Sequence, residues 1–577
     1  MAALRFCYLV LALCSLSVTV SADSGKKEKK KKIIFMNYDP FFSIFYFFAV
    51  HLSLECGSPF GDSTYVDKNS ITWTGDDKYI KGGEIRYVKS DDRVLQRMRV
   101  FTAARKKNCY HIDTMRRGRV LVRATFYYGN YDNKSSPPTF DLHFDGNFWK
   151  TVVTSISEVV SYEVIYVMRR DWITVCLART KDGQFPFIST LEIRSLDWFM
   201  YTGIPESYPL FLRRRDPFDY GIIRCIHIVF RIPPIPISIY GRDKSFATVM
   251  AVSNTFLLRY PDDPYDRIWS TEIANLGQNR FYSDAYFYYQ HSSDVVPSRD
   301  EPPPRVLRYG VYAPTPNSSL QIFTLHNYET PAYVNLYFTE FRYNRQLNET
   351  RSFTVFKDDK QISLPIWPPY GNFTELTFPN LSVSGTSTFS VVPTTYSTLA
   401  PAISALEIFL IGDMLTDGTE GSDALGLIDL QKGFDDVLRE WRGDPCLPAP
   451  FSYDWIVCNY SYSRPRITAI SLGSFGLSGP LPDFESMHAL QTIDFHNNSL
   501  RGPIPDFLGK LPNLKILNLE NNHFSGSIPA SLLNNKGLTL MVSGNPDLSS
   551  CTRMKINIIV QILFGTIISS IMLHAWA

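Results

Sequence analysis

Most of the chain between residues 54 and 415 consists of short apolar runs that are rich in β-branched and aromatic residues. Asn, Gly, Asp and Pro separate these runs, which predicts β-strands joined by turns. The candidates in the first half are 85–88, 120–128, 140–144, 162–167, 172–177 and 189–193. Many short strands at fairly regular spacing predict a mainly β protein of the β-sandwich or jelly-roll type.

One stretch of eight residues occurs twice. Residues 186–193, Pro-Phe-Ile-Ser-Thr-Leu-Glu-Ile, return as residues 401–408, Pro-Ala-Ile-Ser-Ala-Leu-Glu-Ile. Comparable strand-like blocks precede both copies, at 121–128 and 140–144 and again at 334–341 and 353–356. The repetition predicts two related β domains in tandem, over 54–205 and 256–415.

The pattern fails between the two domains, and we expect a linker or insertion over 206–255. Residues 231–237, Arg-Ile-Pro-Pro-Ile-Pro-Ile, hold too much proline for a central strand. Just beyond it, Asp262, Asp263 and Asp266 have the oxygen ligands that a hard cation prefers. Asp-Pro turns explain them as well, and we expect neither a metal nor a cofactor.

A second repeat occupies the C-terminal part of the chain. Leu490, Leu514 and Leu538 recur in steps of 24 residues, with Ile467 one step of 23 earlier. Within each unit the pattern L-x-x-L-x-L-x-x-N-x-L predicts a leucine-rich-repeat solenoid over 467–548. Its Asn amide is suited to backbone groups that the turn leaves exposed.

A cap for the solenoid is expected over 416–466. Apolar residues three or four apart predict a helix over 423–442. Cys446 and Cys458, twelve residues apart, most simply form a disulfide in a secreted chain. Cys56, Cys109 and Cys176 offer a further disulfide, whose pairing the sequence leaves open.

The two ends of the chain predict secretion and membrane attachment. Residues 1–22 have the charged start, apolar core and small-residue cleavage site of a signal peptide. Residues 23–53 are either a second, internal membrane segment or an atypical insertion that arises from splicing or from the gene model, and we favour the insertion. The apolar tail 556–577 is either a membrane span or a GPI signal. We therefore expect the folded part to lie on the extracellular face of the plasma membrane.

Glycosylation and charge agree with that location. The N-x-Ser/Thr acceptors are Asn133, Asn317, Asn348, Asn372, Asn380, Asn459 and Asn497. A formal charge of +2, from 58 basic and 56 acidic residues, provides no global field for nucleic acid. We therefore expect no nucleic-acid partner.

The whole pattern resembles the extracellular region of plant malectin-like, leucine-rich-repeat receptor kinases, over 54–548. The stretches that carry the resemblance are 71–74, 108–110, 128–132, 186–193, 267–269 and 443–446. Kinase motifs do not follow the solenoid, so we expect a receptor-like protein that lacks a kinase domain. The resemblance implies a carbohydrate or peptide ligand, such as a cell-wall saccharide or a secreted peptide, and a co-receptor kinase as a possible partner.

Sugar recognition requires flat aromatic faces beside carboxylate and amide groups on exposed loops. The candidate ligand-binding residues are Tyr127, Tyr128, Tyr131 and Asp132 in the first domain, and Arg342 and Tyr343 in the second. We expect a binding protein and not an enzyme. Two alternatives stay open: an extracellular glycosidase that uses paired carboxylates, and a truncated product of a receptor-kinase gene.

Overall fold

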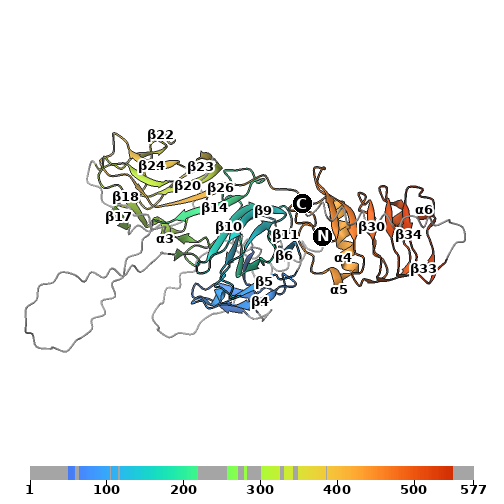
Figure 1. Ribbon diagram of the computed structural model, residues 1–577. Coiled ribbons are helices and arrows are strands. Elements are labelled where there is room, and N and C mark those ends of the chain that lie inside the picture. The colour runs from blue at the N-terminus through green and yellow to red at the C-terminus, as the bar shows by residue number, and fades with distance from the viewer. Residues whose placement is uncertain are drawn as a thin grey trace, which may run out of the picture. The chain divides into compact units, whose positions relative to one another are not determined.

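The computed structural model describes residues 50–58, 64–103, 105–114, 117–218, 257–270, 279–282, 300–324, 330–341, 349–384 and 386–549. This part of the chain is mainly β, as the sequence predicts (Figure 1). It contains two blocks of antiparallel strands and a solenoid of parallel strands. The predicted signal peptide, most of the atypical insertion and the apolar tail lie outside the described residues.

The first block has three groups of strands. In the first group the order is β1 (His51–Glu55), β13 (Thr190–Ser195), β7 (Arg119–Phe126) and β10 (Val160–Val167). The strands β3 (Thr72–Gly75) and β2 (Thr64–Val66) extend its edge beside β1. The second group is β6 (Lys107–Asp113), β11 (Trp172–Ala178), β8 (Thr139–Phe144) and β9 (Asn147–Val153). The third is β12 (Phe187–Ile188), β5 (Arg97–Val100) and β4 (Glu84–Tyr87).

The second block repeats this arrangement in the same order. Its first group is β14 (Leu210–Asp216), β26 (Ala405–Ile411), β20 (Thr330–Phe338) and β23 (Thr374–Val383). The second is β19 (Leu320–Thr324), β24 (Thr388–Pro393), β21 (Phe353–Lys357) and β22 (Lys360–Gln361). The third is β25 (Ala402–Ile403), β18 (Tyr309–Tyr312) and β17 (Asn279–Tyr282). The two octapeptides therefore form corresponding strands, β12 with β13 and β25 with β26.

Strand β14 corrects the expected linker. We expect residues 206–255 to form a linker or insertion, but residues 210–216 pair with β26, and Leu210 and Phe211 also pair with β10 on the other side. This pairing joins both blocks into one ten-stranded sheet. The three arginines at 213–215 gave the segment a polar appearance, yet Arg215 is buried. Residues 219–255 lie outside the described residues.

The strands bury apolar side chains on both faces of the shared sheet. Val120, Val122 and Ala124 of β7 belong to the core of the first block. Leu121, between them in the sequence, points the other way and joins a cluster that includes Tyr333 and Phe409 of the second block. Successive side chains of β7 thus point into two different cores. The second core contains residues of both blocks and packs them against each other.

The solenoid stacks one short strand from each repeat. Its parallel sheet has the order β28 (Arg466–Ser471), β30 (Thr492–Asp494), β32 (Ile516–Asn518) and β34 (Thr539–Met541). A second sheet consists of β29 (Ser478–Gly479), β31 (Ser499–Pro503), β33 (His523–Ser527) and β35 (Leu548–Ser549). The cap contributes α4 (Gly421–Gly433), α5 (Asp435–Leu438) and the antiparallel strand β27 (Ile456–Asn459). The shorter helix α6 (Ala530–Leu533) lies in the last repeats, and the predicted solenoid is confirmed.

Buried asparagines hold successive repeats together. Asn522 donates to the carbonyl oxygens of Phe495, Leu519 and Glu520 and accepts from the backbone N–H of Leu500. Asn498 and Asn545 make corresponding contacts one repeat before and one repeat after. Each amide satisfies backbone groups from two adjacent turns, which is the role that the repeat pattern predicts.

The cap contacts the first block around two disulfides. Cys446 and Cys458, the pair expected from the sequence, are bonded, and Cys109 is bonded to Cys176 across β6 and β11. Gly443, with a φ of +90°, lies so close that a Cβ atom there would be 2.7 Å from Cys109 Sγ. Lys107, which is buried, donates to the carbonyl oxygens of Asp444 and Leu447. These contacts hold the cap against β6.

Candidate functional site

The predicted tyrosine cluster lies on the loop that follows β7. Tyr128 is fully buried in the core of the first block, so its ring has no exposed face. Its hydroxyl donates to Asp132 Oδ1 and accepts from the backbone N–H of Ser136. Tyr128 therefore anchors the loop, and a role in ligand contact can only be indirect.

The other members of the cluster reach the surface. Tyr131 is half-buried, and its ring packs edge-on against Tyr128, with 5.4 Å between ring centroids. It also contacts Phe187 of the first octapeptide at 5.9 Å. Tyr127 and Asp132 are likewise partly exposed. Ligand contact by Tyr127, Tyr131 and Asp132 stays a prediction.

Strand β4 adds groups that the sequence did not single out. A Cβ atom on Gly129 would lie 2.0 Å from Val88 Cγ2, so the tyrosine loop packs closely on the residues that follow β4. Next to Val88, the ring of Tyr87 is 63% exposed. Arg86 forms an ion pair with Glu84 on the same strand. The signal available in the sequence was an aromatic residue, Tyr87, at the end of a short polar stretch.

We call the exposed residues Tyr87, Tyr127, Tyr131 and Asp132 the tyrosine surface. It combines flat rings with a carboxylate and a neighbouring ion pair, which are the groups that sugars and peptides require. Burial and the charge of Asp132 raise the pKa of Tyr131 above its ordinary range. The phenol is therefore a neutral hydrogen-bond donor at physiological pH.

Some of the remaining predicted site residues lie outside the described part of the chain, and the others are exposed or half-buried. Arg342, Tyr343 and the acceptor Asn348 lie outside the described residues. The acceptors at exposed positions are Asn133, Asn317, Asn372, Asn380 and Asn497, and Asn459 is half-buried. Asn133 lies on the tyrosine loop itself, with a φ of 57°. Glycosylation at these positions stays a prediction.

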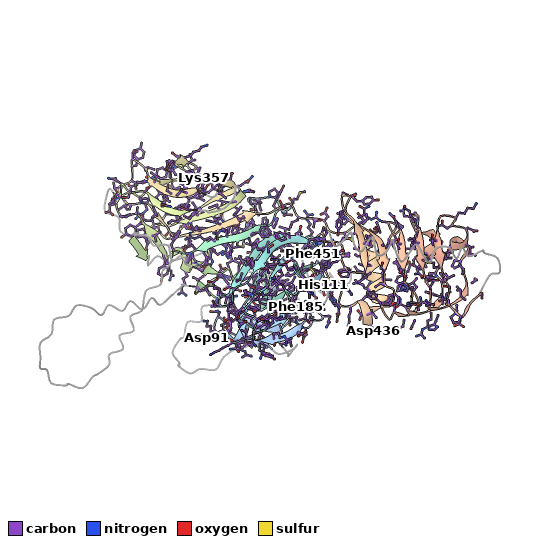
Figure 2. All side chains as sticks on the ribbon, viewed as in Figure 1. Asp91, His111, Phe185, Lys357, Asp436 and Phe451 are labelled. Carbon is purple, nitrogen blue, oxygen red and sulfur yellow. A yellow bond between two sulfur atoms is a disulfide. The ribbon has the colours of Figure 1, made fainter. Side chains whose placement is uncertain are left out.

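A cavity of about 260 Å³ lies where the first block meets the cap. It is lined by the start of β1, by Lys78 and Tyr79, by His111 and Asp113 of β6, and by Arg442 of the cap. Figure 2 labels His111. Burial lowers the pKa of His111, and the charge of Arg442 lowers it further. Nothing in the sequence indicated this cavity, because Arg442 lies more than 300 residues from the other lining residues.

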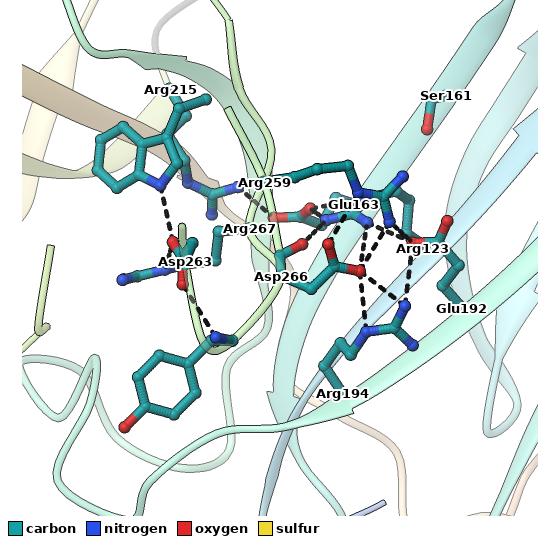
Figure 3. Close-up of polar contacts among 12 residues, drawn as sticks. Arg123, Ser161, Glu163, Glu192, Arg194, Arg215, Arg259, Asp263, Asp266 and Arg267 are labelled. Atoms are coloured by element: carbon teal, nitrogen blue, oxygen red, sulfur yellow. Dashed lines mark hydrogen bonds and ion pairs between the residues drawn. The ribbon is translucent and has the colours of Figure 1, made fainter. Parts of the chain in front are cut away.

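Two of the three clustered aspartates, Asp263 and Asp266, take part in a buried ion network (Figure 3), whereas Asp262 pairs with Arg305 at the surface. Asp263 Oδ2 accepts from Arg267 Nε and Trp269 Nε1, both at 2.8 Å. Asp266 Oδ2 accepts from Arg194 at 2.6 Å and from Arg259 at 2.7 Å. Arginine and tryptophan hydrogens thus occupy the carboxylate oxygens that we considered as cation ligands. The strands that supply Arg194 and Arg123 belong to the first block, so the loop 259–267 is bound to it.

Two family models match the chain. Residues 54–411 match the model described as a malectin-like domain. Residues 489–511 and 513–535 match the model of the leucine-rich repeat. Within the described part of the chain, none of the helices is long and apolar enough to cross a membrane.

The similar curated proteins are receptor kinases of Arabidopsis thaliana. One is named "Probable LRR receptor-like serine/threonine-protein kinase At1g67720"; it is 31% identical over 507 residues, which cover 83% of this chain and 49% of that protein. A second, At1g05700, carries the same description and is 33% identical over 449 residues, which cover 74% of this chain and 46% of that protein. The chain spans about half the length of these relatives.

Two solved structures of plant receptor ectodomains align with part of the chain. The ANXUR1 extracellular domain from Arabidopsis thaliana has a TM-score of 0.47 at 15% identity, covering 63% of this chain and 97% of that one. A structure of the plant peptide RALF23 in complex with FER and LLG2 has a TM-score of 0.46 at 13% identity, covering 63% and 95%.

Proposed function

The chain belongs to the malectin-like family, and on that premise we propose that it is a non-catalytic recognition protein of the cell surface. Its β blocks bind an extracellular ligand, either a cell-wall saccharide or a secreted peptide. Its solenoid docks a partner, for which a co-receptor kinase is our candidate. The two blocks are jelly-roll sandwiches in this proposal, and the chain is attached to the membrane through residues 556–577.

The tyrosine surface is the observation that carries the ligand-binding role. Tyr131 is held on one side by Tyr128 and Phe187, both fully buried, so its orientation is set before any ligand arrives. A pre-positioned ring loses little conformational entropy on binding. The carboxylate of Asp132, fixed by Tyr128, can accept hydrogen bonds from sugar hydroxyls or peptide N–H groups. Together these features support recognition by a rigid, partly apolar surface.

The solenoid supports the docking role. Its parallel sheet places Ala469, Thr492, Ile516 and Thr539 in one row across four strands. The residue that follows each of the first three in its strand is buried and faces the core. These residues are Ile470, Ile493 and Leu517. The outer row therefore consists of uncharged side chains at regular spacing, and stacked repeats commonly use such a surface for binding.

The ligand-binding role is tested with the secreted chain on an array of plant saccharides and on a second array of secreted-peptide fragments. We expect Tyr131→Ala to weaken binding to the recognised ligand by about tenfold, because it removes the exposed ring and its stacking area. Tyr396→Ala is the matched control, since Tyr396 is 76% exposed and belongs to the second block. Tyr128→Ala is unsuitable because it would open a cavity in the core.

Equal binding by the wild type and Tyr131→Ala would remove the tyrosine surface from the proposal. Failure to bind either array would remove the ligand-binding role. The glycosidase alternative is tested separately, by turnover of a panel of chromogenic glycosides. Release of chromophore above the level of a denatured sample would overturn the non-catalytic assignment.

A further inference from the structure

The cavity between the first block and the cap holds two cations whose charges are not compensated. Lys78 and Arg442 both line it. Lys78 Nζ lies 5.6 Å from the ring centroid of Tyr79, and Arg442 Nε donates to the carbonyl oxygen of Arg439. Among the described residues, neither cation has a carboxylate partner within ion-pair distance.

Two arginines close to the cavity are paired. Arg99, on the other side of the turn that carries Lys78, binds Asp76 and Asp77. Arg105 binds Glu440, two residues before Arg442. The turn and the cap segment thus supply carboxylates to these two arginines, whereas Lys78 and Arg442 at the cavity wall have no such partner among the described residues. Lys78 and Arg442 therefore create a positive potential at the cavity wall.

The carboxylate in the cavity wall does not cancel this potential. Asp113 is held by His111, with 3.2 Å between Oδ1 and Nε2, and its side chain is 90% exposed. Burial lowers the pKa of His111, so its imidazole is neutral at pH 7 and adds a polar group without a charge. An anion entering the cavity would meet two cations and a carboxylate that points into water.

The walls also offer flat faces. The ring of His111 lies 5.2 Å from the ring of Trp172, at an interplanar angle of 33°. The guanidinium of Arg170 also lies over Trp172, with 4.6 Å between Cζ and the ring centroid. Tyr79 lines the cavity beside them and fixes β6 by accepting the backbone N–H of His111 through its own carbonyl oxygen at 2.9 Å. The cavity thus has both cationic donors and ring faces.

From this arrangement we propose that the cavity is a second binding site, which takes a small ring-containing carboxylate. Lys78 and the guanidinium of Arg442 bind the carboxylate, and Tyr79 and His111 pack against the ring. Because Lys78 belongs to the first block and Arg442 to the cap, the bound molecule connects the two. This site is separate from the tyrosine surface and does not depend on it.

The experiment is isothermal titration of the whole secreted chain with two matched pairs of probes. Glucuronate is compared with glucose, and hippurate with its amide, so that each pair differs in the carboxylate. We expect one acid to bind and its neutral partner to bind at least about tenfold more weakly, because charge-assisted hydrogen bonds are lost. Binding of glucuronate identifies a sugar acid as the source, and binding of hippurate an aromatic acid. No preference for either acid would overturn the proposal.

Variants connect the affinity to the cavity. Lys78→Ala and Arg442→Ala should each weaken binding of the acid about tenfold. Lys81→Ala and Arg439→Ala are matched controls that remove the same charges from exposed positions outside the cavity wall, and they should retain the wild-type affinity. Equal losses in variants and controls would show a diffuse charge effect and overturn the site.

A second measurement follows His111 by NMR. A bound anion close to the imidazole should raise the pKa of His111, and the same acid should leave it unchanged in Arg442→Ala. Retained acid binding in Tyr131→Ala separates this site from the tyrosine surface. Loss of acid binding in Tyr131→Ala, with Lys78→Ala unaffected, would assign the acid to the tyrosine surface instead.

Discussion

Glu192 and Glu407 occupy the same position in the two octapeptides, and each accepts a hydrogen bond from a buried arginine of the shared sheet. Glu192 Oε2 binds Arg123 and Arg259. Glu407 Oε1 binds Arg215 Nε at 2.6 Å. The glutamate is thus retained in both copies for one physical purpose, which is to neutralise an arginine that the sheet buries.

Removing that charge in the second copy should be costly. In Glu407→Gln, the guanidinium of Arg215 loses a fully buried partner, and the hydroxyls of Tyr201 and Tyr337 lose their carboxylate acceptor. We expect the free energy of unfolding to fall by about 3 kcal/mol, measured by urea denaturation. Glu84→Gln, which removes an exposed partner of Arg86, is the control and should change it by less than about 1 kcal/mol. Similar values for both variants would contradict the role of burial.

The close contact between the cap and the first block requires a glycine at position 443. In Gly443→Ala, a methyl group would meet Cys109 Sγ at 2.7 Å, in a left-handed backbone conformation that alanine disfavours. We expect a loss of about 2–4 kcal/mol and faster proteolysis of the segment around residues 412–420. Gly476→Ala has a φ of +76° and open space around it, so it isolates the backbone contribution. An equal loss of unfolding free energy in Gly443→Ala and Gly476→Ala would show that the close approach of Gly443 to Cys109 does not stabilise the cap contact.

The asparagine ladder should dominate the stability of the solenoid. Asn522→Ala leaves three carbonyl groups and one N–H group of adjacent turns without their partner. We expect a cost of about 2–4 kcal/mol, seen as earlier loss of amide protection in β30 and β32 by hydrogen exchange. Asn513→Ala, which removes one exposed bond to the carbonyl oxygen of His488, should cost less than about 1 kcal/mol. Protection that is lost equally across the β blocks would argue against a local effect.

The stability of the cap contact should depend on pH through Lys107. Burial lowers the pKa of Lys107 to about 7. An unfolded lysine keeps its proton to a pKa of about 10.4. Between these values the unfolded state binds more protons, so the free energy of unfolding should rise as pH increases from about 7. Lys107→Met should remove this rise, whereas the exposed Lys106→Met should retain it; a slope unchanged in Lys107→Met would contradict the assignment.

Local patterns revealed much of the fold, because duplication and repetition leave their period in the chain. The octapeptides, the Leu490 series and the Cys446–Cys458 pair lie within short windows, and each corresponds to a strand, repeat or bridge in the structure. Residues 210–216 were missed because a run of arginines looks like an exposed segment. Their true environment depends on Glu163 and Glu407, and Glu407 lies 192 residues from Arg215.

The candidate site was predicted less well for a related reason. Tyr127 and Tyr128 are adjacent, and only the direction of the strand decides which ring is buried. The structure buries Tyr128 and leaves Tyr131 partly exposed, whereas the sequence treats them alike. Tyr87 and the cavity cations Lys78 and Arg442 meet their neighbours only through tertiary contacts, so no local pattern contains them.

Strand β14 has a mechanical consequence. It is bonded along one edge to β10 and along the other to β26, so no free hinge runs between the two blocks. Separating them would break the β10–β14 pairing and would take Glu163 away from the buried Arg215. The blocks should therefore move as one body. A ligand that changes the shape of this protein must act where the cap rests on β6, through a joint held by a glycine, a lysine and a few carbonyl groups.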